Sequence, residues 1–239
     1  TRPVITYGID TGADVRASGL RQEGMQTHFT VRRTGSDDEL PITLNLPGRH
    51  NVLNALAAIA VALELGVGVA AIQHALKDFQ GIGRRFQATE CQLPAGGQVL
   101  LIDDYGHHPR EVAATLEAVR EGWPGRRLIL AFQPHRYSRT QEQFDDFVQV
   151  LSRADVLLLT EVYPAGEAPI PGADGRALSR AIRTRGQVDP IFVDPLSELA
   201  EVLTGLIREG DMVLTLGAGD IGAVAANLPV TLCVQEGGR

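Results

Sequence analysis

The sequence predicts an α/β protein with two domains, the second of which is built on a mostly parallel sheet with helices on both faces. Two observations lead to this prediction. From residue 86 onward, short apolar runs alternate with segments of helical periodicity. Before that point lies a glycine-containing connection, GIGRR, and the pattern on its N-terminal side is different. We therefore expect a domain boundary near Arg85, with domains at 1–85 and 86–239.

The first 46 residues are expected to form a small antiparallel region. Alternating patterns between turns predict four strands, at Val4–Tyr7, Val15–Gln22, Gln26–Arg33 and Pro41–Leu46. Two helices are predicted next, over Val52–Leu65 and Val69–Lys77. The first of them is apolar on almost every face, which indicates a helix buried inside a domain.

Two asparagines stand near the start of the first helix. Asn51 and Asn54 are three residues apart, so their side chains share a face. The residues alone favour Asn51 as a helix cap that accepts hydrogen bonds from backbone N–H groups. The alternative is that both side chains project toward a base or a sugar.

The second domain alternates strands and helices in a Rossmann-like pattern. Its first two strands, Phe86–Gln92 and Gln98–Asp103, are predicted to form a hairpin. The other strands are predicted at Leu128–Phe132, Val156–Thr160, Ile191–Val193 and Met212–Thr215. The helices are predicted at Pro109–Glu121, Gln141–Ser152, Gly175–Thr184 and Leu196–Arg208.

Polar residues gather after the strands at 98–103 and 128–132. A right-handed crossover between these strands would make them parallel neighbours, so both would end at the same edge of the sheet. Ligands bind at that edge in open α/β sheets. The polar residues there are Asp103, Asp104, Tyr105, His107, His108, His135, Arg136 and Arg139. Packing alone does not require so many polar groups, so this edge is the predicted site.

An anion is expected beside the two arginines of this set. Thr140 and Gln143 match a capping box, which predicts a helix that begins directly behind Arg136 and Arg139. Both the helix dipole and the guanidinium groups favour negative charge at that point. Lys77 is the only lysine among 22 basic residues, so arginines would have to bind any anion.

The composition argues against several classes of protein. The net charge of −7 does not suit a general nucleic-acid or membrane-surface binder. No Gly-Lys-Ser/Thr sequence is present to end a phosphate-binding loop. The chain has no apolar run long enough for a membrane span, so none is expected, and its first residues do not show the basic region and apolar core of a signal peptide. It opens in mid-fold, which suggests that an earlier part of the protein is missing.

The two cysteines indicate the redox environment. Cys91 and Cys233 are too few for a disulfide framework and too far apart in sequence for a metal knuckle. We therefore expect reduced thiols and a cytoplasmic protein.

Five segments resemble the ATP-dependent Mur ligases of peptidoglycan synthesis, in the family's order and at compatible spacing. They are GRHNVLNALAA, GIGRRFQ, DDYGHHPREV, QPHRYSRT and GAGDI. Within the family, Tyr105-Gly106 is more similar to the members that add L-alanine to UDP-N-acetylmuramate. The members that reattach a recycled tripeptide usually carry Phe-Ala there, and this activity is the alternative.

The resemblance implies a role for each matching residue. Asn51 and Asn54 would face the adenine of ATP. Arg85 would lie near the phosphates and ribose, and Asp104 would hold the ribose hydroxyls. The amino-acid end of the site would be lined by Tyr105, His107, His135, Arg136 and Arg139. The last two would hold the alanine carboxylate, with nearby phosphoryl oxygens as a second possibility.

The family's reaction uses ATP and Mg²⁺ to make an acyl phosphate, which the amine of alanine attacks. The phosphate-binding lysine of the family is missing from this chain, so no catalytic residue is predicted in it. The resemblance implies a fragment that contains the end of the central ATPase domain and the whole C-terminal domain, inactive alone. The implied partners are UDP-N-acetylmuramate, L-alanine and ATP, without nucleic acid or membrane, and the oligomeric state stays open.

Three other functions are compatible with parts of the sequence. GAGDIG matches the dinucleotide fingerprint of an NAD-dependent oxidoreductase, with Glu236 after a later apolar run, although a tight turn before a short helix is favoured. A hydrolase using Zn²⁺ or Mn²⁺ would draw on Asp103, Asp104, His107 and His108, but adjacent pairs project in different directions, so no metal site is predicted. The chain as it stands would also serve as a binding module without turnover.

Overall fold

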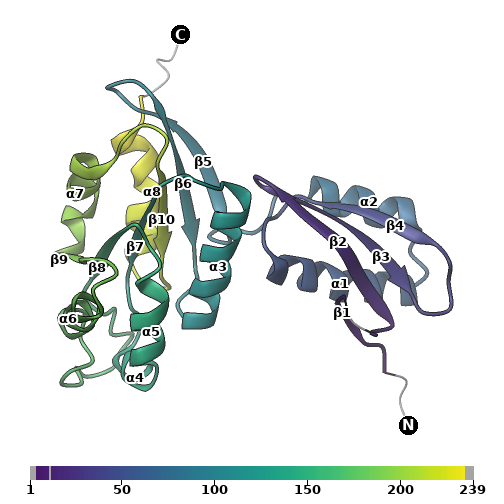
Figure 1. The fold of residues 1–239 in the computed structure, drawn as a ribbon, viewed down its shortest axis with the longest axis horizontal. Helices are drawn as coiled ribbons and strands as arrows, with labels where there is room; N and C mark the ends of the chain where they lie inside the picture. The colour runs from purple at the N-terminus through teal and green to yellow at the C-terminus, as the bar shows by residue number, and fades with distance from the viewer. Residues whose placement is uncertain (1–3, 11, 235–239) are drawn as a thin grey trace. The chain divides into compact units, whose positions relative to one another are not determined.

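The chain divides into two compact units, shown in Figure 1. One runs to Gly81 and includes Glu117–Pro124, and the other contains Ile82–Leu116 and the chain from Gly125 onward. The computed structural model describes residues 4–10 and 12–234. Each unit is a sheet covered by helices, so the protein is of the α/β class that the sequence predicts.

The first unit is built on a four-stranded sheet in the order β1-β2-β3-β4. The strands are β1 (Tyr7–Ile9), β2 (Val15–Glu23), β3 (Gln26–Arg33) and β4 (Glu39–Leu44). The pairs β2–β3 and β3–β4 are antiparallel, as predicted, because tight turns join them. The buried residues alternate along these strands, for example Phe29 and Val31 on β3, and form one face of the core.

The prediction of a purely antiparallel region is wrong for β1, which pairs with β2 in parallel. The strand also lies at Tyr7–Ile9 rather than at Val4–Tyr7. The carboxylate of Asp14 accepts hydrogen bonds from the backbone N–H and the hydroxyl of Thr6, at 2.8 and 2.7 Å. This contact ties the start of β2 to the residue before β1, so the two strands run side by side in one direction.

Two helices, α1 (Arg49–Glu64) and α2 (Val69–Asp78), cover this sheet. Val52, Leu56 and Ile59 of α1 are buried in the core. The opposite side of α1 is exposed in the described part of the chain, with Val61 and Leu65 60% and 76% exposed. The expectation of a helix buried on every face is therefore wrong for this structure.

The second unit contains a six-stranded sheet in the order β5-β6-β10-β7-β8-β9. Its strands are β5 (Gln87–Gln92), β6 (Gln98–Asp104), β7 (Leu128–Phe132), β8 (Val156–Thr160), β9 (Ile191–Val193) and β10 (Met212–Leu216). The hairpin β5–β6 is antiparallel and all other pairs are parallel, as the apolar runs predict.

The strand order corrects one prediction. The strands β6 and β7 are not neighbours, because β10 lies between them and pairs in parallel with both. The connection from β6 to β7 therefore passes over one strand position in the sheet, and β10 occupies that position. The ends of β6 and β7 still reach the same edge, since both run parallel to β10.

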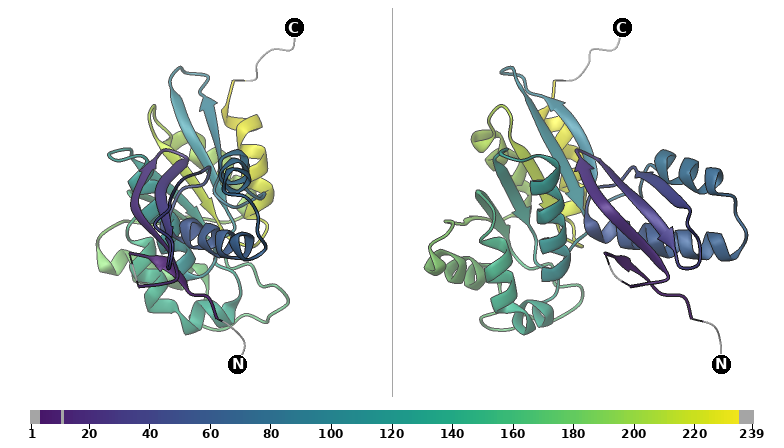
Figure 2. Two further views of the ribbon diagram at one scale, coloured as in Figure 1. Left: turned by 90° about the vertical axis from the view of Figure 1, so that its right-hand side faces the viewer. Right: turned by 45° about the vertical axis from the view of Figure 1, so that its right-hand side comes forward.

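Helices cover both faces of the second sheet (Figure 2). They are α3 (Pro109–Gly122), α4 (Tyr137–Glu142), α5 (Phe144–Leu151), α6 (Gly175–Arg185), the 3-10 turn η1 (Leu196–Glu198), α7 (Leu199–Leu206) and α8 (Ile221–Leu232). Leu203 of α7 and Leu228 of α8 share one core with Leu101 and Ile129 of the sheet. On the other face, Phe132 of β7 contacts Phe147 of α5, with ring centroids 5.5 Å apart.

Two helices differ from their predicted bounds. Where one helix was expected from Gln141, the structure has α4 and α5, and α4 begins before Thr140. Thr140 is buried inside α4 and its hydroxyl donates to the carbonyl of Arg136 at 2.9 Å, so the capping-box prediction is wrong. Helix α8 is longer than the sequence indicated, since it continues through Pro229 and buries Leu232.

The expectation of reduced thiols is also wrong in this structure. A disulfide joins Cys91 of β5 to Cys233 at the end of α8, with Cα atoms 5.2 Å apart. The backbone N–H of Val234 donates to the carbonyl of Gln92 at 2.7 Å beside it. The end of α8 is therefore held on the edge strand β5, a contact that a sequence separation of 142 residues does not reveal.

Candidate functional site

The predicted site residues of the second unit meet at the carboxyl edge of the parallel sheet. Asp104 is the last residue of β6, Tyr105 to His108 follow it, and Gln133 to Arg139 follow β7. The rings of His107 and His135 lie 5.5 Å apart between centroids, so the two strand ends are in contact although β10 separates the strands. The structure thus brings together the side chains that the sequence assigned to one edge.

Four rings form a row along this edge. The ring of His107 contacts Tyr105 on one side, at 5.4 Å, and His135 on the other. The ring of His135 in turn stacks on Tyr163, which follows β8, at 5.4 Å and an interplanar angle of 15°. The row therefore connects three strand ends, and Tyr163 is a member that sequence reasoning did not select.

Asp104 is buried, with 6% of its surface exposed. One of its carboxylate oxygens accepts from the backbone N–H of Phe86 at 2.9 Å, and the other accepts from that of Gly106 at 2.8 Å. The carboxylate therefore joins the backbone that enters β5 to the loop that follows β6. Asp104 therefore has a structural role in this unit. The family resemblance implies ribose binding for the same residue.

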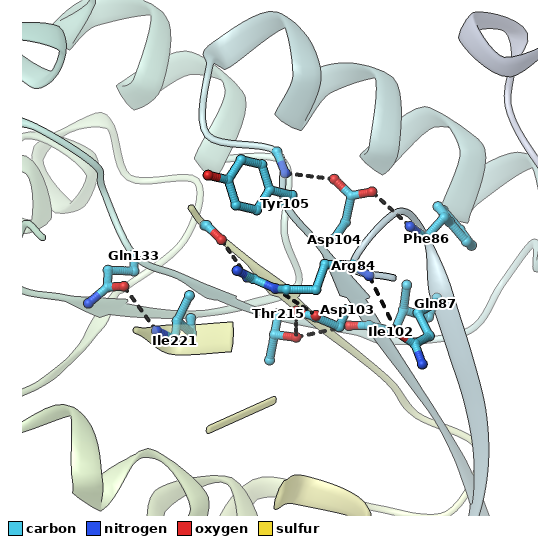
Figure 3. Close-up of polar contacts among 12 residues, drawn as sticks. Arg84, Phe86, Gln87, Ile102, Asp103, Asp104, Tyr105, Gln133, Thr215 and Ile221 are labelled. Carbon is cyan, nitrogen blue, oxygen red and sulfur yellow. Dashed lines mark hydrogen bonds and ion pairs between the residues drawn. The ribbon is translucent and has the colours of Figure 1, made fainter. Parts of the chain in front are cut away.

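Arg84 lies across the ends of β6 and β10, beside Asp103, as Figure 3 shows. Its Nε donates to Asp103 at 3.0 Å and its Nη2 donates to the carbonyl of Gly217 at 2.6 Å. Asp103 also accepts from the hydroxyl of Thr215 on β10 at 3.0 Å. This network joins the connection between the units to two central strands, and sequence reasoning considered only the neighbouring Arg85.

The two adjacent arginines differ in their contacts. Both guanidinium groups lie near the ring of Tyr105, at 5.2 Å for Arg84 and 5.6 Å for Arg85. Arg85 is exposed, and its guanidinium group lies over the ring of Tyr105. Its charge is exposed, whereas the guanidinium group of Arg84 is bound by Asp103 and Gly217.

His135 and Arg139 are bound to each other. The Nη1 of Arg139 donates to the carbonyl of His135 at 3.0 Å and lies 3.3 Å from its Nδ1. Burial and the positive charges of His107, Arg139 and Arg136 lower the pKa of His135 below its ordinary value of 6.5. Because an arginine can only donate, the neutral imidazole accepts at Nδ1 and carries its proton on Nε2.

Arg136 stands where the chain enters α4. Its backbone has a φ of 73°, in the left-handed region, which costs a non-glycine residue about 1–3 kcal/mol. Its side chain is exposed, and within the described residues no hydrogen bond of its guanidinium group is found. The protein therefore keeps an unfavourable backbone conformation at Arg136, and this conformation sets the direction of its exposed side chain.

Helix α3 begins with a second set of contacts. The backbone N–H groups of His107 and His108 donate to the carboxylate of Glu111, at 2.9 and 3.1 Å. Burial raises the pKa of Glu111, but these two hydrogen bonds and the nearby charges of His107 and Arg85 lower it by a larger amount. The pKa is therefore below its ordinary value. His108 accepts from the N–H of Arg110 at 3.3 Å and so acts as a helix cap, not as a metal ligand.

The GAGDIG segment forms a tight turn between β10 and α8. A Cβ atom on Gly219 would meet the side chains of Gln133 and Tyr163 at 2.4 and 2.6 Å. Gln133 is buried and accepts from the N–H of Ile221 at 3.1 Å, so a side chain that directly follows β7 caps α8. Gln133 and Tyr163 leave no room for a Cβ atom at Gly219, so packing within the protein accounts for the glycine. This favours a tight turn over a dinucleotide site. Glu236, the acidic residue of that alternative, lies outside the described residues.

The two asparagines of the first unit do not cap α1. Gly48, with a φ of 91°, occupies the cap position, because the chain turns there in a conformation that glycine tolerates best. The amide of Asn51 instead donates to the carbonyl of Pro47 at 2.8 Å, and that of exposed Asn54 donates to Asn51 at 3.4 Å. The two side chains share a face, as predicted, and the capping interpretation is wrong.

Metal and membrane features were also examined along the chain. Within residues 4–10 and 12–234, no group of three or more His, Cys, Asp or Glu side chains is arranged to bind a metal ion. None of the helices in those ranges has the length and apolar character of a membrane span.

Two family models match the chain. The model for the "Mur ligase, glutamate ligase domain" matches residues 84–219, and that for the "Mur ligase middle domain" matches residues 1–62. A UDP-N-acetylmuramate–L-alanine ligase from Methylococcus capsulatus is 58% identical over 232 residues. These residues are 97% of this chain and 49% of that protein.

Solved structures show the same fold. UDP-N-acetylmuramate–alanine ligase from Thermotoga maritima has a TM-score of 0.78 at 29% identity, over 94% of this chain and 46% of that one. The murein peptide ligase from Psychrobacter arcticus has a TM-score of 0.61 at 24% identity, over 94% of this chain and 45% of that one. The chain thus spans about half the length of the relatives that it matches.

Proposed function

Because the chain belongs to the Mur ligase family, we propose that it is part of an ATP-dependent ligase that joins L-alanine to UDP-N-acetylmuramate. The observation that carries this proposal is the 58% identity to an L-alanine ligase over nearly the whole chain. In that protein, residues 1–85 would end the central ATP-binding domain and 86–239 would form the C-terminal domain. The chain matches about half of each relative's length. The domains that bind the UDP-sugar and the phosphates would lie in the other half.

The amino-acid end of the site is proposed at the row of rings. Arg136 and Arg139 carry positive charge at this edge, and a carboxylate would accept from their guanidinium groups. Tyr105, His107 and His135 would line the same end. Since neutral His135 keeps its ring proton on Nε2, it would serve as a hydrogen-bond donor to the substrate.

The nucleotide-binding residues are proposed to be Asn51 and Asn54 in the first unit and Arg85 and Asp104 in the second. The amides of the two asparagines would face the adenine, and the exposed guanidinium group of Arg85 would meet the phosphates. Asp104 would hold the ribose while it also accepts from Phe86 and Gly106. Each of these assignments follows the family motif that the residue matches.

This chain's contribution to the chemistry would be to bind and orient. ATP supplies the phosphoryl group that activates the muramate carboxylate, and holding alanine by its carboxylate would direct its amine toward that centre. Lys77 is the only lysine and lies on α2, outside any phosphate-binding loop. We therefore expect the 239-residue chain to be inactive alone. Because its proposed substrates include nucleotides, we propose that the enzyme works in the cytoplasm.

The test compares two proteins. One is the 239-residue chain, and the other is the chain extended by the N-terminal half that its relatives have. ADP release should require L-alanine, UDP-N-acetylmuramate and ATP together, and only in the extended protein. Alanine ligation by the 239-residue chain, or no ligation by the extended protein, would contradict the proposal.

The alternative is the ligase that reattaches a recycled tripeptide. The same assay with a tripeptide that begins with L-alanine distinguishes the two activities. We expect free L-alanine to be the better substrate, and a higher kcat/KM for the tripeptide would favour the alternative.

A further inference from the structure

Glu167 reaches from the loop between β8 and α6 to the start of α4. Its carboxylate accepts two hydrogen bonds from Ser138, from the backbone N–H at 2.9 Å and from the hydroxyl at 2.7 Å. These two bonds, helped by the charge of Arg136, lower the pKa of Glu167 below its ordinary value. The carboxylate is therefore ionised at neutral pH and acts as the cap of this short helix.

Two backbone hydrogen bonds hold the same loop against the segment before α4. The N–H of Arg136 donates to the carbonyl of Tyr163 at 2.9 Å, and the N–H of Tyr163 donates to the carbonyl of Pro134 at 2.8 Å. The ring of Tyr163 stacks on His135. The loop thus binds every second residue from Pro134 to Ser138.

Arg136 is held from its other side by α4 itself. Its carbonyl accepts from the N–H and the hydroxyl of Thr140, at 3.1 and 2.9 Å. Its left-handed backbone is therefore maintained by the loop on one side and by the helix on the other. Arg139 follows one turn later on the same helix and is bound to His135.

We propose that Glu167 is a positioning residue for the amino-acid substrate, because its two hydrogen bonds with Ser138 hold Arg136 and Arg139 in the arrangement that binds the alanine carboxylate. This inference rests on the proposed function, and it adds a residue that does not touch the substrate. Two arginines must keep a fixed spacing to bind one carboxylate, and the six-residue helix α4 is too short to provide this alone.

The first test is steady-state kinetics of the extended protein with Glu167→Ala, Ser138→Ala and the control Glu142→Ala. Glu142 is an exposed carboxylate on the same helix. In Glu167→Ala we expect the KM for L-alanine to rise about tenfold, as for the loss of hydrogen bonds to a charged group. The KM for ATP and the KM for UDP-N-acetylmuramate should stay close to wild type, and the melting temperature should fall only by the small amount that loss of a helix cap causes.

Ser138→Ala removes only the hydroxyl bond and should have a smaller effect of the same kind. The double variant should be no worse than Glu167→Ala, because the two side chains act through one contact. Glu142→Ala should match wild type. An unchanged KM for L-alanine in Glu167→Ala, or an equal rise for all three substrates, would overturn the inference.

A second measurement separates this inference from the proposed function. Amide hydrogen exchange of the 239-residue chain needs no activity, and in Glu167→Ala the amides of Ser138 and Thr140 should exchange about tenfold faster than in Glu142→Ala. Unchanged exchange would overturn the positioning role even if the extended protein is an alanine ligase. Faster exchange in a protein without ligase activity would contradict only the proposed function.

Discussion

Arg84 and Arg85 are adjacent arginines with different contacts. Arg84 pairs with Asp103, whose side chain is 16% exposed, and with a backbone carbonyl, whereas Arg85 is exposed. Removing Arg84 leaves a mostly buried carboxylate without its cation, and this costs more than losing a surface charge.

We therefore predict that Arg84→Ala lowers the free energy of unfolding by about 1–3 kcal/mol, and that Arg85→Ala changes it by less than about 0.5 kcal/mol. Urea denaturation of the 239-residue chain measures both. Asp103→Asn should recover part of the loss in an Arg84→Ala background, because the unpaired charge is removed. Equal losses for the two arginines would contradict this assignment.

The protonation of His135 is a second property that belongs to one residue. Its pKa is lowered, so between that pKa and 6.5 the unfolded chain binds more protons than the folded one. The contribution of His135 to stability is therefore complete above pH 6.5 and declines as the pH falls through this window.

An NMR titration of the His135 ring should give a pKa below 6.5. In Arg139→Gln this pKa should rise, because the variant removes a positive charge and a donor to Nδ1. A His135 pKa that does not respond to Arg139→Gln would refute the assigned tautomer.

At the scale of elements, α1 is an apolar helix with one buried and one exposed side. Ile59 is 1% exposed and belongs to the core, whereas Val61, two residues later, is 60% exposed. The apolar composition alone does not distinguish these sides, because an uncovered side can have the same residues as a covered one.

Ile59→Ala should therefore lower the free energy of unfolding of the 239-residue chain by about 2–4 kcal/mol, through lost burial and a cavity. Val61→Ala should change it by less than about 0.5 kcal/mol, since the side chain is exposed and alanine favours helices. Urea denaturation of both variants is the measurement. A cost above 1 kcal/mol for Val61→Ala would mean that this side of α1 is covered in solution.

At the scale of the whole second unit, the disulfide closes a long stretch of chain. Cys91 and Cys233 are 142 residues apart, and a cross-link of this kind stabilises mainly by restricting the unfolded chain. It also holds the end of α8 at the edge strand.

We predict that reduction lowers the free energy of unfolding by about 2–4 kcal/mol. Thermal melting with and without dithiothreitol should show the difference in the wild type and none in Cys233→Ser. Thiol titration of the unfolded, unreduced protein should find no free cysteine. Two free thiols in protein purified without reductant would mean that the pair stays reduced in the cell.

Much of the second unit could be predicted from the sequence because its strands are short apolar runs between glycines, prolines and polar segments. A strand buried on both faces needs such a run, so β7, β8 and β9 were placed at their observed residues. The residues after β6 and β7 were assigned to one edge for the same local reason, and the contact of His107 with His135 confirms it.

The sequence by itself determined most of the elements, the mostly parallel second sheet, the family and most of the side chains that line its carboxyl edge, since these depend on local periodicity and on motifs that stand together in the chain. Only the tertiary structure decided that β10 lies between β6 and β7, that Cys91 meets Cys233, and that Glu167 caps α4. Each of these joins segments from about 30 to more than 140 residues apart. Such contacts depend on how the complete sheet and its helices pack, and no local pattern of residues specifies them.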